Sequence, residues 1–208
     1  VLMLEEQGNG SKPPSRARVL IAGLIGNVME WYDFALYGYF ATVIGQQFFP
    51  STNPTASLIG AFGAFAAGFI VRPLGGIVYG RIGDLVGRRR ALTLSVMAMA
   101  VPTVAMAFLP THAQIGIAAP IAVVLLRLLQ GISAGGEYTT SIIFLAEAAP
   151  DRQRGFFSIW GLWGSVLGML MGSAFGDLLT RTLTQTQLDS WGWRVAFALG
   201  SLVALTGV

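Results

Sequence analysis

Cysteine is absent from this chain of 208 residues, histidine occurs once, and only 11% of the residues are charged. The lack of cysteine excludes a disulfide-stabilised secreted domain. Soluble domains carry about 25% charged residues, and the mean hydropathy here is +0.65. With 54% hydrophobic residues, the chain has too little polar surface to cover a water-soluble globule and too many apolar residues to stay disordered. We therefore expect an integral membrane protein.

The sequence pI is about 9.7, which could indicate a nucleic-acid partner, but the net charge is only +3. No long basic run is interleaved with aromatic residues, as a nucleic-acid surface would require. We therefore expect no nucleic acid to bind, and the arginines need another explanation.

Six stretches are apolar enough to be membrane-spanning helices, since about 20 residues of helix cross the hydrocarbon core of a bilayer. They cover approximately residues 19–48, 57–79, 91–109, 117–146, 157–179 and 193–208. We therefore expect an all-α membrane bundle over residues 19–208. Residues 1–18 form a polar cytoplasmic tail that we expect to be disordered, and it lacks the pattern of a signal peptide. The chain begins at Val1 and its last span is short, so we expect a fragment truncated in the sixth helix.

Basic residues gather on alternate sides of these spans. Lys12, Arg16 and Arg18 precede the first span, while further arginines lie between the second and third spans and between the fourth and fifth. The loops after the first and third spans hold none. Because positively charged loops stay in the cytoplasm, we expect a cytoplasmic N-terminus. The same asymmetry explains the high pI.

Charged side chains also occur at membrane depth within the predicted spans. A charge at the centre of a spanning helix costs about 2.5–3.5 kcal/mol on insertion scales, so it faces a partner or a water-filled space. Polar positions recur every three or four residues on two spans, which places them on one face of each helix. The first face has Asn27, Glu30, Asp33 and Tyr37, and the second has Arg127, Gln130, Ser133, Glu137 and Thr140. We expect the two faces to line a shared aqueous cavity.

Opposite charges on these two faces suggest proton-coupled transport of an anionic group. Two carboxylates three residues apart cannot both ionise cheaply in a low-dielectric site, so one of them is expected to hold a proton. Our hypothesis is that Glu30 or Asp33 carries the coupling proton and that Arg127 binds a substrate carboxylate bidentately. Further substrate contacts are expected from Gln130, Asn27, Tyr37 and Glu137. The alternative is a buried ion pair that only locks two helices together.

Small residues mark two expected packing faces. Glycine recurs every four residues on the fifth span, at Gly164, Gly168, Gly172 and Gly176. Gly131 and Gly135 repeat this spacing on the fourth span. Such faces let helix backbones approach closely. They suit static packing and sliding of one helix on another equally well.

The segment between the second and third spans reads Gly80-Arg81-Ile82-Gly83-Asp84-Leu85-Val86-Gly87-Arg88-Arg89-Arg90. We expect a tight cytoplasmic turn permitted by its glycines, with Asp84 capping the third helix or pairing with an arginine. This segment resembles the signature loop of the major facilitator superfamily, with Gly80, Gly83, Asp84, Gly87, Arg88 and Arg89 at signature positions. One departure is Leu85, because the residue after the aspartate is often basic in that superfamily.

Other stretches resemble the metabolite:proton symporter branch of that superfamily, from Arg18 to the end of the chain. They are Glu30-Trp31-Tyr32-Asp33-Phe34, Arg72-Pro73-Leu74-Gly75-Gly76, Arg127-Leu128-Leu129-Gln130-Gly131, Gly135-Gly136-Glu137-Tyr138, Glu147 with Pro150, Arg154 and Gly155, and Trp191-Gly192-Trp193-Arg194. The resemblance implies twelve helices in two six-helix halves, with this chain supplying most of the N-terminal half. It also implies that Asp84 and Arg88 join Glu147 in a cytoplasmic gating latch. Substrates of similar proteins are 2-oxoglutarate, citrate, shikimate, proline and glycine betaine.

We therefore expect a secondary active transporter of the bacterial inner membrane that takes up a small carboxylate-bearing or zwitterionic metabolite with protons, by alternating access. The proton gradient would drive it, with no cofactor and no metal. Its expected partners are the substrate, the lipid bilayer and the C-terminal six-helix half, and we expect the full-length protein to be monomeric.

Three other functions were weighed against this one. An enzyme is not expected, because the single histidine, His112, lies in an outer loop and no catalytic arrangement occurs at any depth. An efflux antiporter of the same superfamily is disfavoured, because the fifth span lacks a Gly-Pro pair. A non-transporting membrane receptor stays open as an alternative.

Overall fold

The computed structural model describes residues 16–150 and 152–206, and every regular element in this described part is a helix. The elements are α1 (Arg16–Tyr39), α2 (Ala41–Phe48), α3 (Pro54–Ile70), α4 (Arg72–Val86), α5 (Arg88–Phe108), α6 (His112–Ile115), α7 (Ala118–Ala148), α8 (Arg154–Thr182), α9 (Gln185–Gln187), the π-helix η1 (Leu188–Gly192) and α10 (Trp193–Thr206). Residues 1–15 of the predicted disordered tail lie outside the described residues, as do residues 207–208 of the last predicted span.

Capping and proline signals set several helix ends. Asn53 caps α3, because its side-chain Oδ1 accepts a hydrogen bond from the backbone N–H of Thr55 at 2.9 Å. Pro54 fits the first turn of that helix, where its missing N–H has no intrahelical partner to lose. At the other end of the bundle α7 stops at Ala148, two residues before Pro150, and a residue that precedes proline is steered away from helical geometry.

The second predicted span, 57–79, is longer in the structure. Helices α3 and α4 together run from Pro54 to Val86 and are interrupted only at Val71. Pro73 lies in the first turn of α4 and has no N–H with which to continue the hydrogen bonding of α3. The interruption therefore lies near the middle of this helical stretch.

The predicted loop over residues 80–90 is wrong for most of its length. Helix α4 continues to Val86 and α5 begins at Arg88, so Gly87 alone forms the turn between them. Its φ of 92° lies in the region that glycine adopts without steric cost. No side chain caps α5 at this turn, so Asp84 does not act as the predicted cap.

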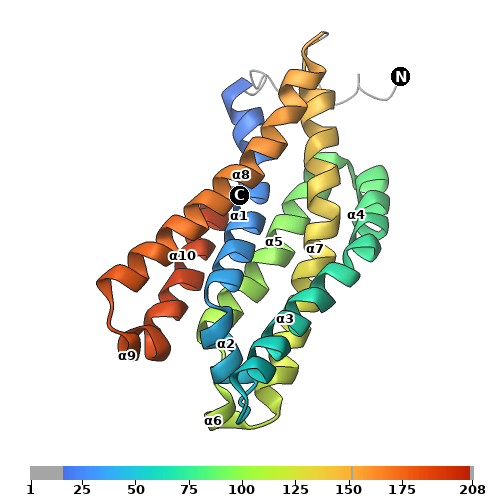
Figure 1. Cartoon of the computed structure of the whole chain (residues 1–208). Helices are drawn as coiled ribbons and strands as arrows, with labels where there is room; N and C mark the ends of the chain where they lie inside the picture. Colours follow the sequence, from blue (N-terminus) through green and yellow to red (C-terminus); the bar gives the residue numbers. More distant parts are fainter. Residues whose placement is uncertain (1–15, 151, 207–208) are drawn as a thin grey trace.

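Figure 1 shows the long helices side by side, with α1 between α8 and α7, and α3 and α4 on the far side of α7. The turn at Gly87 and the α7–α8 connection lie at one end of the bundle. Short helices α6 and α9 lie at the opposite end, near the connection from α2 to α3. The arginine-rich and arginine-free connections therefore occupy opposite ends.

Both predicted glycine faces are close helix contacts. On α8, a β-carbon at Gly164, Gly168 or Gly172 would meet the backbone of α1. On α7, a β-carbon at Gly131 or Gly135 would meet a carbonyl group of α3 or α4. Because two helix backbones approach this closely only where side chains are absent, these glycines set the distances of α8 from α1 and of α3 and α4 from α7.

Four helical stretches of the described chain are long and apolar enough to cross a membrane, by length and composition alone: 54–86, 90–108, 118–148 and 154–182. The remaining two predicted spans are also helical. The first is divided at Phe40 into α1 and α2, and α1 carries Glu30 and Asp33. The last is represented by α10, which is 14 residues long.

Candidate functional site

The polar faces predicted on the first and fourth spans meet in the interior of the bundle. They belong to α1 and α7, which are in direct contact. Every residue of the two predicted faces is buried, and this set is Asn27, Glu30, Asp33, Tyr37, Arg127, Gln130, Ser133, Glu137 and Thr140. Burial of so many polar groups is unfavourable unless they find partners, and the partners divide them into separate groups.

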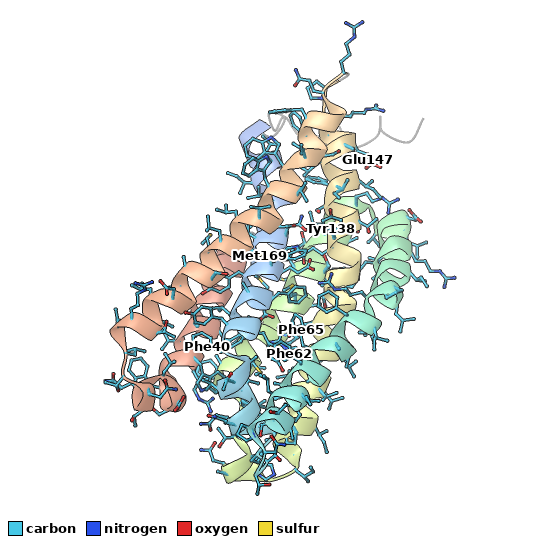
Figure 2. The ribbon with its side chains drawn as sticks, in the orientation of Figure 1. Phe40, Phe62, Phe65, Tyr138, Glu147 and Met169 are labelled. Carbon is cyan, nitrogen blue, oxygen red and sulfur yellow. The ribbon has the colours of Figure 1, made fainter. Side chains whose placement is uncertain are left out.

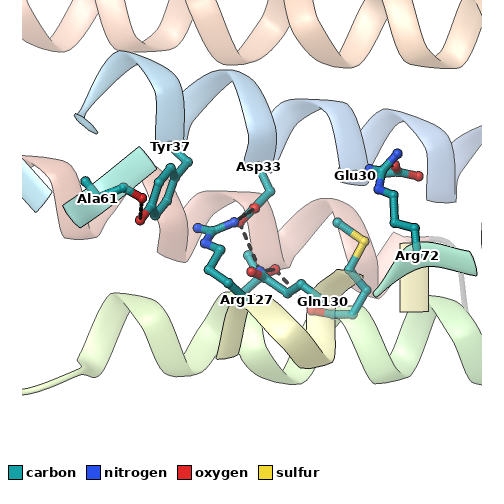
Figure 3. Close-up of polar contacts among 9 residues, drawn as sticks. Glu30, Asp33, Tyr37, Ala61, Arg72, Arg127 and Gln130 are labelled. Carbon is teal, nitrogen blue, oxygen red and sulfur yellow. Dashed lines mark hydrogen bonds and ion pairs between the residues drawn. The ribbon is translucent and has the colours of Figure 1, made fainter. Parts of the chain in front are cut away.

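Asp33 and Arg127 form the first group. The guanidinium Nη1 of Arg127 donates to Asp33 Oδ2 at 2.5 Å, and Gln130 Nε2 donates to Asp33 Oδ1 at 3.2 Å (Figure 3). Thr103 on α5 accepts from the same Gln130 nitrogen at 2.8 Å. The side chains of Asp33 and Arg127 are 0% and 2% exposed, so the described residues seal this ion pair from solvent.

Tyr37 completes this first group. Its ring lies under the guanidinium, with the Arg127 Cζ 3.9 Å from the ring centroid. Its hydroxyl donates to the carbonyl oxygen of Ala61 at 2.8 Å, which ties the group to α3. An arginine stacked on an aromatic face and paired with a carboxylate has its charge compensated in two ways. Three predicted substrate residues, Tyr37, Arg127 and Gln130, are therefore gathered around Asp33.

Glu30 and Arg72 form the second group. Arg72 Nη2 donates to Glu30 Oε1 across the contact between α4 and α1 (Figure 3). The guanidinium also lies over two aromatic rings, 4.2 Å from the centroid of Phe69 and 4.6 Å from that of Phe34. The Arg72 side chain is 22% exposed, so this pair is open on one side, unlike the pair of Asp33 with Arg127.

Arg72 was missed as a site residue by the sequence reasoning. The predicted span ended at Tyr79, which placed Arg72 near a membrane surface, where an arginine is unremarkable. Because the helical stretch runs to Val86, Arg72 lies near its middle. The sequence does contain a signal that Arg72 lies at membrane depth, because long apolar stretches flank it on both sides.

Glu137 and Asn27 lie apart from both ion pairs. Glu137 is 0% exposed, and neither of its carboxylate oxygens has a hydrogen-bond partner in the described part of the chain. The Glu137 carboxylate fits against α1 because Gly26 has no side chain. A β-carbon at residue 26 would collide with that carboxylate. Asn27 instead donates to Ser141 Oγ at 2.8 Å, which joins α1 to α7. These two predicted substrate residues therefore do not contact Asp33 or Arg127.

A pocket of about 370 Å³ opens beside the second ion pair, between α1, α4 and α7. Its lining consists of Glu30, Trp31, Arg72, Pro73, Gly76, Ala134, Gly135, Tyr138 and Thr139. In Figure 2, Tyr138 lies about halfway along the bundle. Asp33 and Arg127 are not part of this lining. We expected Glu30, Asp33 and Arg127 to line one shared cavity. Of these three residues, only Glu30 lines the pocket.

The signature segment lies at the end of the bundle where α4 joins α5. Asp84 Oδ1 and Arg88 Nη2 form an exposed ion pair of 2.7 Å, which agrees with the pairing alternative for Asp84. Gly83 is packed against the Arg88 side chain, whereas Gly80 has open space beside it. The side chain of Arg89 lies outside the described part.

The expected latch partner, Glu147, is exposed in the last turn of α7, near the upper end of that helix in Figure 2. Among the described residues, no hydrogen bond or ion pair joins it to Asp84 or Arg88. The latch that the family resemblance implies is therefore not formed in this structure.

The described chain contains no cluster of three or more histidine, cysteine, aspartate and glutamate side chains that could hold a metal ion. The side chains gathered at the two ion pairs carry carboxyl, guanidinium, amide and aromatic groups. Such groups bind and exchange protons and small charged molecules.

Together the helical bundle and its buried charges define a multi-pass membrane protein with a polar core. Residues 19–208 match the family described as "Sugar (and other) transporter". Because this match covers nearly the whole chain, the chain belongs to that family. The family is described as one of transporters, and the all-α fold that we expected is confirmed for the described residues.

Two relatives from bacteria are similar over 92% of this chain. The "Glycine betaine/proline/ectoine/pipecolic acid transporter OusA" of Dickeya dadantii is 39% identical over 191 residues. The "Proline/betaine transporter" of Salmonella typhimurium is 38% identical over 191 residues. In both cases the chain spans 38% of the relative's length.

Solved structures of the proton:xylose symporter XylE have the same fold. One of them, bound to 6-bromo-6-deoxy-D-glucose, matches 92% of this chain with a TM-score of 0.82 and 20% sequence identity. An inward-open structure of XylE from E. coli matches with a TM-score of 0.80. This chain covers 43% and 46% of the chains in those two structures, and at this identity the likeness concerns the fold.

Proposed function

We propose that the full-length protein couples the inward movement of protons to the uptake of a small zwitterionic or carboxylate-bearing metabolite. The observation that carries this proposal is the sealed ion pair of Asp33 with Arg127 between α1 and α7. The fold and the family are those of a transporter. The names of the relatives, which are transporters of proline and betaine, support the substrate class.

A proton on Asp33 would change the interactions between α1 and α7. The ionised carboxylate accepts from both Arg127 and Gln130, whereas a protonated carboxyl loses its charge and part of its acceptor capacity. Breaking a buried ion pair leaves one charge uncompensated, at a cost of about 3–5 kcal/mol. Protonation therefore favours a different arrangement of the two helices, which is what coupling to an alternating-access transition requires.

Glu30 is the second candidate for the coupling proton. It lies one helical turn before Asp33 and borders the open pocket, which gives it a shorter route to water. The two acids have different partners, since Glu30 is paired with Arg72 and Asp33 with Arg127. Their roles can therefore be separated by single substitutions.

We further propose a cytoplasmic N-terminus and a location in the bacterial inner membrane. The arginine-bearing connections at Gly87 and after α7 lie at one end of the bundle (Figure 1). The positive-inside rule assigns that end to the cytoplasm. A cysteine placed at residue 111, in the arginine-free connection before α6, should then react with an impermeant maleimide added to intact cells.

The decisive experiment measures accumulation of labelled glycine betaine by cells that express the full-length protein, with and without a protonophore. Proton-coupled uptake predicts that the protonophore lowers accumulation to equilibration. Asp33→Asn should abolish accumulation but retain exchange of internal for external substrate, because exchange needs no net proton movement. Glu30→Gln is assayed in parallel.

Full proton-driven accumulation by both variants would overturn the coupling assignment. Accumulation by the unsubstituted protein that ignores the protonophore would overturn proton coupling itself. Net export of a preloaded substrate in the presence of a proton gradient would favour an efflux antiporter instead.

A further inference from the structure

Arg127 and Arg72, the arginines of the two ion pairs, differ in what surrounds their guanidinium groups. Arg127 is enclosed by Asp33, Gln130 and Tyr37. Arg72 borders the 370 Å³ pocket between α1, α4 and α7. A substrate can reach Arg72 from this pocket, whereas a substrate that reached Arg127 would first have to displace the Asp33 carboxylate and the Tyr37 ring.

The Arg72 side chain is also accessible. Its Nη2 donates to Glu30 and its side chain is 22% exposed, whereas its Nε is buried without a partner among the described residues. A guanidinium presents several donors in one plane, which suits a carboxylate held by two parallel hydrogen bonds. An incoming carboxylate can therefore share Arg72 with Glu30 or take its place.

The charges that border the pocket balance each other. Glu30 from α1 contributes one carboxylate and Arg72 from α4 one guanidinium, and the two are paired. A ligand that offered only a carboxylate would add an uncompensated negative charge to this pair. A ligand that also carries a positive charge keeps the balance.

Aromatic residues of the same pocket can bind the positive charge of such a ligand. Trp31 and Tyr138 both line the pocket, and the faces of tryptophan and tyrosine attract alkylammonium groups. The site therefore offers a guanidinium for an anionic group, and aromatic rings and the Glu30 carboxylate for a cationic group.

We infer that this pocket is the zwitterion-binding subsite of this half of the transporter. Arg72 binds the carboxylate in exchange for Glu30, and Trp31 and Tyr138 receive the ammonium group. This inference rests on the proposed function and deepens it, because it moves the carboxylate contact from Arg127 to Arg72 and names the charge pattern of the substrate.

Three probes separate the two charges of the ligand. Glycine betaine carries both charges. 3,3-Dimethylbutyrate has the same shape and carboxylate, with carbon in place of the positive nitrogen, and choline keeps the quaternary ammonium without the carboxylate. Competition with labelled glycine betaine is measured on the purified full-length protein. The unsubstituted protein should prefer glycine betaine to each of the other two probes.

The variants test each contact against a matched control. Arg72→Gln should weaken glycine betaine binding by at least about 30-fold, and Arg72→Gln combined with Glu30→Gln should bind as weakly. Arg181→Gln breaks an exposed arginine–aspartate pair on α8 and should leave binding unchanged. Tyr138→Leu should weaken binding by about tenfold, while Tyr138→Phe, which keeps the ring, should not.

The double variant distinguishes a binding role from a structural one. If Arg72 only neutralises Glu30, removing both charges restores the fold and binding returns to normal, which would overturn the inference. Equal binding of glycine betaine and 3,3-dimethylbutyrate by the unsubstituted protein would also overturn it. Protein that binds none of the three probes would overturn this inference and the substrate class together. Uptake that ignores a protonophore would overturn only the proton coupling of the proposed function.

Discussion

The two ion pairs of α1 resemble each other in composition and differ in their surroundings. Asp33 with Arg127 and Glu30 with Arg72 each join a carboxylate to a guanidinium stacked on aromatic rings. The first pair is sealed among α1, α5 and α7, and the second borders a pocket. We propose two purposes for this shared chemistry: the sealed pair responds to protons and the open pair responds to ligands.

The first prediction concerns the sealed pair and has the largest expected effect on stability. Arg127→Gln should lower the free energy of unfolding of the full-length protein in detergent by about 3–5 kcal/mol, because it leaves Asp33 buried without its cation. Denaturation midpoints of purified protein measure this loss. Combining Arg127→Gln with Asp33→Asn should recover most of it. Equal instability of the single and double variants would mean that the charge of Asp33 is not the cause.

A second prediction concerns Gly135 of α7, which contacts the backbone of Arg72 in the open pair. Gly135 lies against the backbone carbonyl of Arg72, so a β-carbon would push the start of α4 away from α7. Gly135→Ala should cost about 1–3 kcal/mol of stability and weaken glycine betaine binding, as measured by unfolding and by competition binding. Gly63→Ala is the matched control, because Gly63 has open space beside it on α3. Similar losses in both variants would argue against a specific contact at Gly135.

A third prediction compares access to the two pairs. This chain contains no cysteine, so single cysteines can be introduced into a full-length protein freed of any others. Thr139 lies in the wall of the pocket, whereas Thr103 lies beside Gln130 and is 1% exposed. The two variants to compare are therefore Thr139→Cys and Thr103→Cys. The first should react with a small methanethiosulfonate reagent at least about tenfold faster, since thiol reactivity follows exposure, and glycine betaine should slow it. Equal labelling rates would contradict the contrast between a sealed and an open pair.

The smallest effect is expected at the exposed pair of the signature segment. Asp84 is 68% exposed in its ion pair with Arg88, and surface pairs of this kind contribute about 0–1 kcal/mol. Asp84→Asn should therefore change the unfolding free energy by less than about 0.5 kcal/mol. A loss as large as that of Arg127→Gln would show that this pair has buried partners in the complete protein.

Periodic polar patterns made part of the site predictable. Asp33, Tyr37, Arg127 and Gln130 recur at helical spacing in otherwise apolar spans, and the structure brings these four together. The glycines of α8 were equally readable, because a residue without a side chain every fourth position has few uses other than close packing. Both signals are local, so a single sequence reveals them.

The pairing of Glu30 with Arg72 could not be read in the same way. It depends on how closely α4 approaches α1, which the contact of Gly135 with the backbone of Arg72 helps to set. That contact joins residues far apart in the chain. The boundary error at residues 80–90 has a different cause, because glycines and charged residues are typical of loops. In α4, Gly80 and Gly83 are instead accommodated within the helix.

The division of roles between the two pairs is tested most directly by recording proton and substrate movement together. Vesicles containing the full-length protein receive labelled glycine betaine in weak buffer while the external pH is followed. The account predicts that the unsubstituted protein alkalinises the medium as substrate enters, and that Asp33→Asn binds and exchanges glycine betaine without moving protons. Alkalinisation by Asp33→Asn equal to that of the unsubstituted protein, per molecule of glycine betaine taken up, would contradict it.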